Sequence, residues 1–92
     1  MKVLDQSEID QKLTALKGWE FKNNLIGKDY ELNDFKEALG FVNKIGDKAE
    51  QMDHHPDIFL HDWNKVKITV STHSAGGVTE NDFKLAEMIE NI

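Results

Sequence analysis

The chain has 92 residues, a formal net charge of −6 and no cysteine. This length favours one domain over residues 1–92, and the excess of acids argues against direct nucleic-acid binding, which needs clustered lysine and arginine. Without cysteine there is neither a disulfide framework nor a thiolate metal site. No apolar run approaches the ~20 residues that span a bilayer, and the N-terminus lacks a signal-peptide core. We therefore expect a cytoplasmic protein with no membrane partner.

The N-terminal segment predicts a short helix. Ser7 precedes acidic residues and is expected to be its N-cap, and Gly18 supplies a stop beyond its end. Apolar residues follow at helical spacing on one face: Ile9, Leu13 and Leu16.

A hairpin is predicted next. Trp19 and Phe21 alternate with polar residues as in a half-buried strand, and Asn23-Asn24 suits a turn because asparagine tolerates positive φ. Trp19 itself is expected in the core or at an interface. The second predicted strand ends at Leu32. One of its faces consists of Ile26, Lys28, Tyr30 and Leu32, and Lys28 is the polar member of that face.

The clearest periodic segment predicts a long helix capped by Asn33. It must end near Asp53, because Pro56 excludes the α region for His55. Its apolar positions share one face: Phe35, Ala38, Leu39, Val42, Ile45, Ala49 and Met52.

A second hairpin and a last helix complete the chain. A strand over 58–63 and a turn at Asn64-Lys65 precede the strongest strand pattern, whose apolar face carries Val66, Ile68, Val70 and Thr72. After a loop at 75–77, Thr79 and Asp82 predict a capping box, and the following helix has an apolar side of Phe83, Ala86, Met88 and Ile89.

The predicted order is α-β-β-α-β-β-α. Two hairpins that are each followed by a helix predict an α+β fold, a four-stranded antiparallel sheet with three helices packed on one face. Open edge strands in so small a domain favour self-association.

Three of the four histidines fall in two short segments, as His54-His55 and as His73. Histidine both gives and takes protons near neutral pH, so the cluster suits removal of water from a substrate without a metal or a cofactor. Adjacent residues of an extended segment point to opposite sides, so His54 and His55 are expected to act separately.

Acidic residues surround these histidines and can hold the imidazoles in chosen tautomers. The candidates are Glu50, Asp53, Asp57 and Asp82. Two other interpretations stay open at this point. The histidine pair can be ordinary surface residues, and three imidazoles with an acid can hold zinc. His61 matches neither segment and is expected to be a solvated strand residue.

The same residues resemble the pterin-4a-carbinolamine dehydratase family. The resemblance covers nearly the whole chain, from Gly18-Trp19 through the 26–35 segment to the end. Its core is a series of linked motifs: Glu50, Asp53-His54-His55-Pro56, Asn64-Lys65-Val66, Ser71-Thr72-His73, Gly76-Gly77 and Thr79-Glu80-Asn81-Asp82.

The resemblance implies dehydration of 4a-hydroxytetrahydropterins to quinonoid dihydropterins, which recycles the pterin cofactor of aromatic amino-acid hydroxylases. It implies no cofactor, no metal, and assembly as a homodimer or homotetramer. The implied site consists of catalytic His54, His55 and His73, pterin contacts from His54-His55-Pro56 and Thr72-His73-Ser74-Ala75, and supporting Glu50, Asp53, Asp82 and Trp19.

Two alternatives to this function come with the same family. Some animal members also serve as a dimerisation cofactor for a transcription factor, so a non-catalytic interaction module is one. A pterin-binding role in molybdopterin metabolism is the other.

Overall fold

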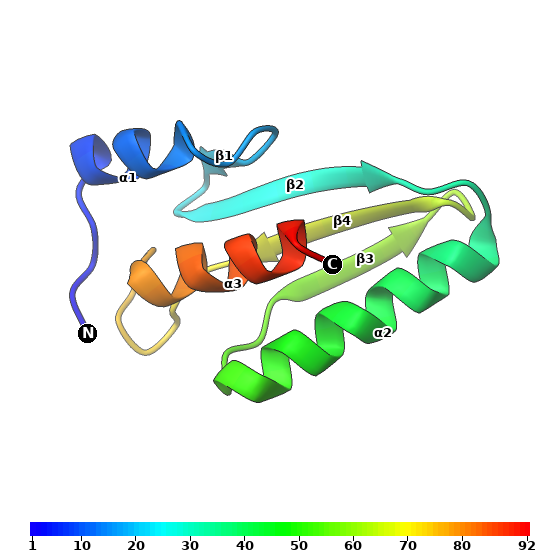
Figure 1. Ribbon diagram of the computed structural model, residues 1–92. Helices are drawn as coiled ribbons and strands as arrows, with labels where there is room; N and C mark the ends of the chain where they lie inside the picture. The colour runs from blue at the N-terminus through cyan, green and yellow to red at the C-terminus, as the bar shows by residue number, and fades with distance from the viewer.

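The computed structural model describes residues 1–92 and has the predicted order of elements (Figure 1). The elements are α1 (Gln6–Leu13), β1 (Glu20–Lys22), β2 (Leu25–Glu31), α2 (Phe35–Met52), β3 (Asp57–His61), β4 (Lys65–Val70) and α3 (Glu80–Glu90). The strands form one antiparallel sheet in the order β1-β2-β4-β3. The predicted α+β fold is therefore confirmed. No helix is both long and apolar enough to cross a membrane.

The core lies between the sheet and the helices. Figure 1 shows α2 and α3 running across the same face of the sheet, with α1 beyond the β1–β2 hairpin. The central strands direct fully buried Ile26, Val66 and Ile68 toward this layer. Leu85 and Ile89 of α3 are buried with them in one apolar cluster. The opposite face of the sheet carries exposed and half-buried residues.

Two predicted helix caps are wrong by one or two residues. Asp5, not Ser7, caps α1, because its carboxylate accepts the backbone N–H of Glu8, whose own carboxylate accepts the N–H of Asp5. Asp34, not Asn33, caps α2 by accepting the N–H of Glu37. In both helices the residue whose carboxylate reaches the N3 amide starts the helix.

The predicted limits of the second hairpin also shift. β3 covers Asp57–His61 rather than 58–63, and the turn is at Asp62 and Trp63, with φ of 47° and 57°, rather than at Asn64-Lys65. Asn64 is buried instead. Its backbone carbonyl accepts the N–H of Leu32, and its side-chain amide donates to the carbonyl of Leu32. The Asn23-Asn24 turn is confirmed, with φ of 54° and 61°.

The apolar face of α2 is only partly covered. Ala38, Ile45 and Ala49 are buried, whereas Phe35 is 49% and Leu39 44% exposed. The helix begins at the far edge of the domain, where no other helix lies over its first turns (Figure 1). Periodicity therefore predicted the helix correctly but overestimated the length of its buried stripe.

Candidate active site

After the end of α2, the side chains of His54 and His55 lie in different surroundings. Asp53 adopts a left-handed conformation with φ of 50°, and the N–H of His54 donates to the carbonyl of Ala49 over 3.0 Å. The chain then runs extended into β3, as the proline at 56 requires. The side chain of His54 is 12% exposed and that of His55 is 57% exposed. Consecutive histidines therefore occupy separate environments.

His54 pairs with Asp82, which the chain places 28 residues later. His54 Nε2 lies 2.6 Å from Asp82 Oδ1, and Asp82 has no exposed surface. A buried carboxylate needs hydrogen-bond donors to offset its lost hydration. His54 is one of three such donors.

The other two donors to Asp82 come from the loop before α3 and from that helix's own cap. Asp82 Oδ2 accepts the hydroxyl of Thr72 over 3.0 Å and the backbone N–H of Thr79 over 2.8 Å. The hydroxyls of Thr72 and Thr79 lie 2.7 Å apart and join the network. The predicted capping box at Thr79 and Asp82 is confirmed, and the capping carboxylate also binds the histidine.

This network determines the tautomer of His54. A carboxylate only accepts hydrogen bonds, so Nε2 of His54 must carry the proton that faces Asp82. In the neutral imidazole Nδ1 is then the unprotonated nitrogen. The buried pair thus prepares one ring nitrogen of His54 to accept a proton.

His55 has a carboxylate partner at the surface. His55 Nε2 lies 2.5 Å from Glu50 Oε2, and the Glu50 side chain is 76% exposed. The same tautomer argument leaves Nδ1 of His55 free. Because both groups are solvated, this pair holds its geometry less firmly than the buried one.

His73 lies in an exposed turn beyond β4 and makes no side-chain hydrogen bond within the chain. Its neighbour Thr72 closes the turn by pairing with Gly77. Thr72 also bonds to Asp82, which bonds to His54. The network therefore connects the two histidine segments that the sequence suggested.

The remaining predicted site residues form no hydrogen bond with a histidine side chain. Asp53 is the C-cap of α2, and Asp57 begins β3; neither bonds to a histidine. Trp19 is buried and donates its indole N–H to Glu90 over 2.8 Å, and Glu90 bonds to none of the three histidines. Pro56 is half-buried and Ser74 exposed, while Ala75 is half-buried.

One member of the network was not among the predicted site residues. Thr79 was expected only as a helix cap, yet its hydroxyl and amide both bind within the network around Asp82. The capping motif itself was the signal that could have indicated this, because it placed Thr79 next to a candidate partner of the histidines. For zinc, no three histidine or acidic side chains converge in an arrangement that could hold a metal ion.

Comparison with known proteins identifies the family of the chain. The family model described as "Pterin 4 alpha carbinolamine dehydratase" matches residues 2–92. A protein of Sulfurisphaera tokodaii that is named "Putative pterin-4-alpha-carbinolamine dehydratase" is 44% identical over the whole chain and 98% of that protein. A protein of Sulfolobus acidocaldarius with the same name is 45% identical over 97% of each chain. The chain belongs to the pterin-4-alpha-carbinolamine dehydratase family.

Solved structures give the same fold. The structure named as a transcriptional coactivator/pterin dehydratase from Brucella melitensis has a TM-score of 0.93 and 37% identity, with 98% of this chain and 97% of that chain covered. A pterin dehydratase-like RuBisCO assembly factor of the alpha-carboxysome has a TM-score of 0.64 at 18% identity and shares the fold alone. The family and the relatives of the chain are named for a dehydratase, and a dehydratase is a hydro-lyase. The predicted enzyme class is therefore confirmed.

Proposed function

We propose that the chain dehydrates a 4a-hydroxytetrahydropterin to the quinonoid dihydropterin by histidine acid–base catalysis. The observation that carries the proposal is the buried His54–Asp82 pair, in a chain whose relatives are named for this dehydration. The reaction would recycle the oxidised pterin cofactor of aromatic amino-acid hydroxylases.

The reaction needs one proton given and one taken. A histidine protonates the 4a-hydroxyl, the carbon–oxygen bond breaks, and water leaves. A second histidine takes a ring-nitrogen proton, whose bonding electrons form the new carbon–nitrogen double bond, so no electron passes to the protein. In its neutral form His54 has an unprotonated Nδ1 that suits the accepting step, while His55 and His73 are exposed to solvent.

Substrate contacts follow from the same segments. We assign the pterin to the surface between the His54-His55-Pro56 segment and the Thr72-His73-Ser74-Ala75 segment. The Thr72–Asp82–His54 bonds support this assignment because they tie the two segments together. Glu50 and Asp82 act as positioning residues, since each fixes a histidine tautomer.

A second candidate function is an interaction module without catalysis. The Brucella melitensis relative is named for coactivation as well as for pterin dehydration. A protein that only binds partners has no chemical need of all three histidines, His54, His55 and His73. The two candidates differ in whether the folded chain accelerates the dehydration.

The test is a stopped-flow measurement of 4a-hydroxytetrahydropterin decay with and without EDTA. We expect acceleration that survives EDTA. His55→Ala and His73→Ala should each lower kcat by about 10²-fold or more, the usual contribution of a general acid or base. His61→Ala is the matched control, because His61 stacks on Phe59 on the open face of the sheet.

Wild-type rates in both variants would overturn the histidine assignment. No acceleration by folded wild-type protein would favour the interaction module or the molybdopterin role. Loss of activity with EDTA would favour a metal-dependent reaction.

A further inference from the structure

The three histidines differ in what holds them. His54 is bonded to Asp82 and His55 to Glu50, whereas the side chain of His73 has no partner within the chain. The position of His73 therefore depends on the backbone of its loop. What fixes that loop also fixes the third histidine.

The loop is closed by its own backbone at residues 72–77. The N–H of Thr72 donates to the carbonyl of Gly77 over 2.9 Å, and the N–H groups of Ala75 and Gly76 both donate to the carbonyl of Thr72 over 3.0 Å. Gly76 has φ of 81°, which only glycine adopts easily. These bonds shape the loop but do not attach its tip to the rest of the domain.

The β1–β2 turn makes that attachment. Asn24 Nδ2 donates to the carbonyl oxygen of Gly76 over 2.9 Å, although the two residues are 52 positions apart. Asn24 is the second residue of the turn that joins β1 to β2, so its backbone is part of the sheet's own hairpin. A turn of the sheet thereby holds the tip of the loop through one side-chain hydrogen bond.

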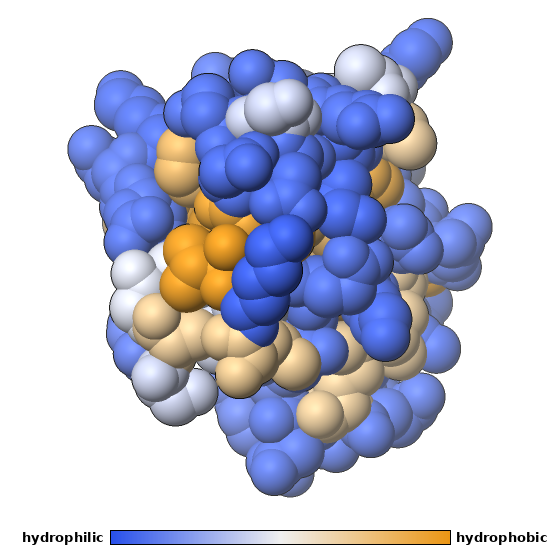
Figure 2. Space-filling model, turned by 90° about the vertical axis from the view of Figure 1, so that its left-hand side faces the viewer, coloured by the Kyte–Doolittle hydropathy of each residue, from blue (hydrophilic) through white to orange (hydrophobic).

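The loop and the turn are also in close contact. A side-chain carbon placed on Gly77 would lie 2.9 Å from Val3 Cγ1 and 3.3 Å from Asn24 Oδ1, closer than such atoms normally approach. The next residue, Val78, accepts the backbone N–H of Leu4 over 2.9 Å. Figure 2 views the side of the molecule that carries the N-terminus and the start of α3, and shows an apolar area surrounded by hydrophilic residues there.

We propose that Asn24 is a positioning residue that holds the His73 loop in its active shape through the Gly76 carbonyl. The catalytic consequence rests on the proposed dehydratase function, whereas the structural consequence does not. Neither the histidine motifs nor their acidic partners include Asn24. Its effect on the reaction passes entirely through the loop backbone.

The test uses two substitutions of Asn24 that tolerate its positive φ. Asn24→Gly removes the side-chain amide, and Asn24→Asp keeps its shape but replaces the donor by an acceptor that repels the Gly76 carbonyl. Asn23→Gly is the matched control, because Asn23 has a similar φ in the same turn and no side-chain hydrogen bond. We expect both Asn24 variants to lower kcat about fivefold to tenfold, the worth of one hydrogen bond, and Asn23→Gly to retain the wild-type value.

Amide hydrogen exchange supplies a readout that is independent of activity. In both Asn24 variants the amides of Ala75 and Gly76 should exchange about fivefold to tenfold faster, while those of Ile68 and Val70 in β4 keep their wild-type rates. Unchanged exchange at 75–76, or acceleration spread equally over β4, would overturn the proposal. A drop in kcat in Asn23→Gly equal to that in Asn24→Gly would also overturn it.

The two proposals fail in distinguishable ways. If wild-type protein does not accelerate the dehydration, the proposed function fails, and the exchange rates still decide whether Asn24 holds the loop. If wild-type protein is active but the exchange at 75–76 is unaffected by both Asn24 substitutions, the positioning role alone fails.

Discussion

Asp82 and Glu50 are both carboxylates that bond to a histidine, but burial separates them. Asp82 is fully buried and uses both oxygens, Oδ1 for His54 and Oδ2 for Thr72 and the Thr79 amide. Glu50 is largely exposed and bonds to His55 alone. A buried pair is costly to disrupt because each group left unpaired cannot turn to water.

We expect Asp82→Asn to be far more damaging than Glu50→Gln. Asparagine has one accepting oxygen, so its NH₂ group would face either the donor at His54 or the donors at residues 72 and 79. The free energy of unfolding should fall by about 1–3 kcal/mol. We also expect kcat to fall by about 10²-fold, because the His54 tautomer is no longer determined.

Glu50→Gln is the control for this prediction. A solvated pair of this kind contributes about 0–1 kcal/mol, so its loss should reduce kcat by less than about fivefold. Urea unfolding measures the stability, and nitrogen NMR of the His54 ring reads its tautomer directly. Equal losses in the two variants would show that burial does not distinguish them.

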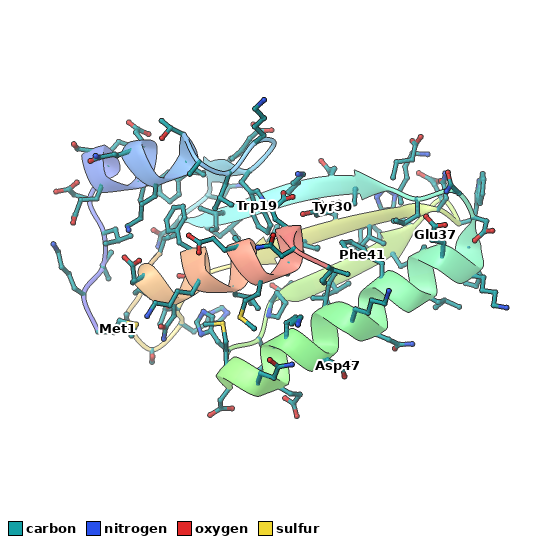
Figure 3. All side chains as sticks on the ribbon, in the orientation of Figure 1. Met1, Trp19, Tyr30, Glu37, Phe41 and Asp47 are labelled. Carbon is teal, nitrogen blue, oxygen red and sulfur yellow. The ribbon has the colours of Figure 1, made fainter.

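At the scale of elements, α3 is anchored at both ends. Asp82 holds its first turn to the histidine network, and Glu90 holds its last turn to β2. Glu90 Oε1 accepts the indole N–H of Trp19 over 2.8 Å, the hydroxyl of Tyr30 over 3.0 Å and the ammonium of Lys28. Figure 3 shows Trp19 and Tyr30 close to the end of this helix.

This anchor explains the polar residue on the apolar face of β2. Lys28 shares that face with buried Ile26 and half-buried Tyr30, and its side chain is only 19% exposed. Its ammonium bonds to Glu90 and to the carbonyl of Lys17, and it lies 4.7 Å from the centre of the Tyr30 ring. Burial, followed by the hydrogen bond to Glu90 and the charge of Glu90, raises the pKa of Tyr30, whose hydroxyl donates to Glu90.

The anchor predicts a pH-dependent stability. Burial alone would raise the pKa of Glu90, but hydrogen bonds from Lys28, Trp19 and Tyr30 outweigh it and hold the pKa below its ordinary value of 4.5. A carboxyl group whose pKa is lowered by folding contributes stability above pH 4.5. That contribution is lost as the pH falls through the lower folded pKa.

We therefore expect Glu90→Gln to lower the free energy of unfolding by about 1–3 kcal/mol at pH 7, the worth of hydrogen bonds to a charged group. The difference between wild type and variant should shrink steadily below pH 4.5. Urea unfolding at pH 7 and at pH 3 measures both values. A difference that stays constant over this range would contradict the role of the ionised carboxylate.

At the scale of the whole molecule, the two faces of the sheet have unequal cover. Helices lie over one face, whereas Phe59 on the other face is 61% exposed and stacks on His61 with 4.7 Å between ring centres. β3 is an edge strand that pairs only with β4. An open edge beside an exposed aromatic ring is a feature that self-association would cover.

We expect the chain to sediment as a homodimer or homotetramer in analytical ultracentrifugation. Phe59→Lys should shift the distribution toward smaller species, because a charge on this face resists burial. Lys84→Gln, an exposed position on α3, is a control that should leave the distribution unchanged. A monomeric wild-type protein across the micromolar to millimolar range would contradict the expectation.

The sequence by itself determined the features that depend on neighbouring residues. The order of the elements follows from local periodicity, the end of α2 from Pro56, the first hairpin turn from two asparagines, and the cap of α3 from Thr79 and Asp82. Each of these signals acts within a few residues along the backbone. For the same reason the histidine segments could be recognised before their geometry was known.

Only the tertiary structure decided which distant groups meet. Four acids were candidate partners of the histidines, and packing selected Asp82 for His54 and Glu50 for His55. The bonds of Lys28 to Glu90 and of Asn24 to Gly76 join residues 62 and 52 positions apart. Such pairs depend on the strand order β1-β2-β4-β3 and on where α3 crosses the sheet, and no short-range preference of the chain encodes either.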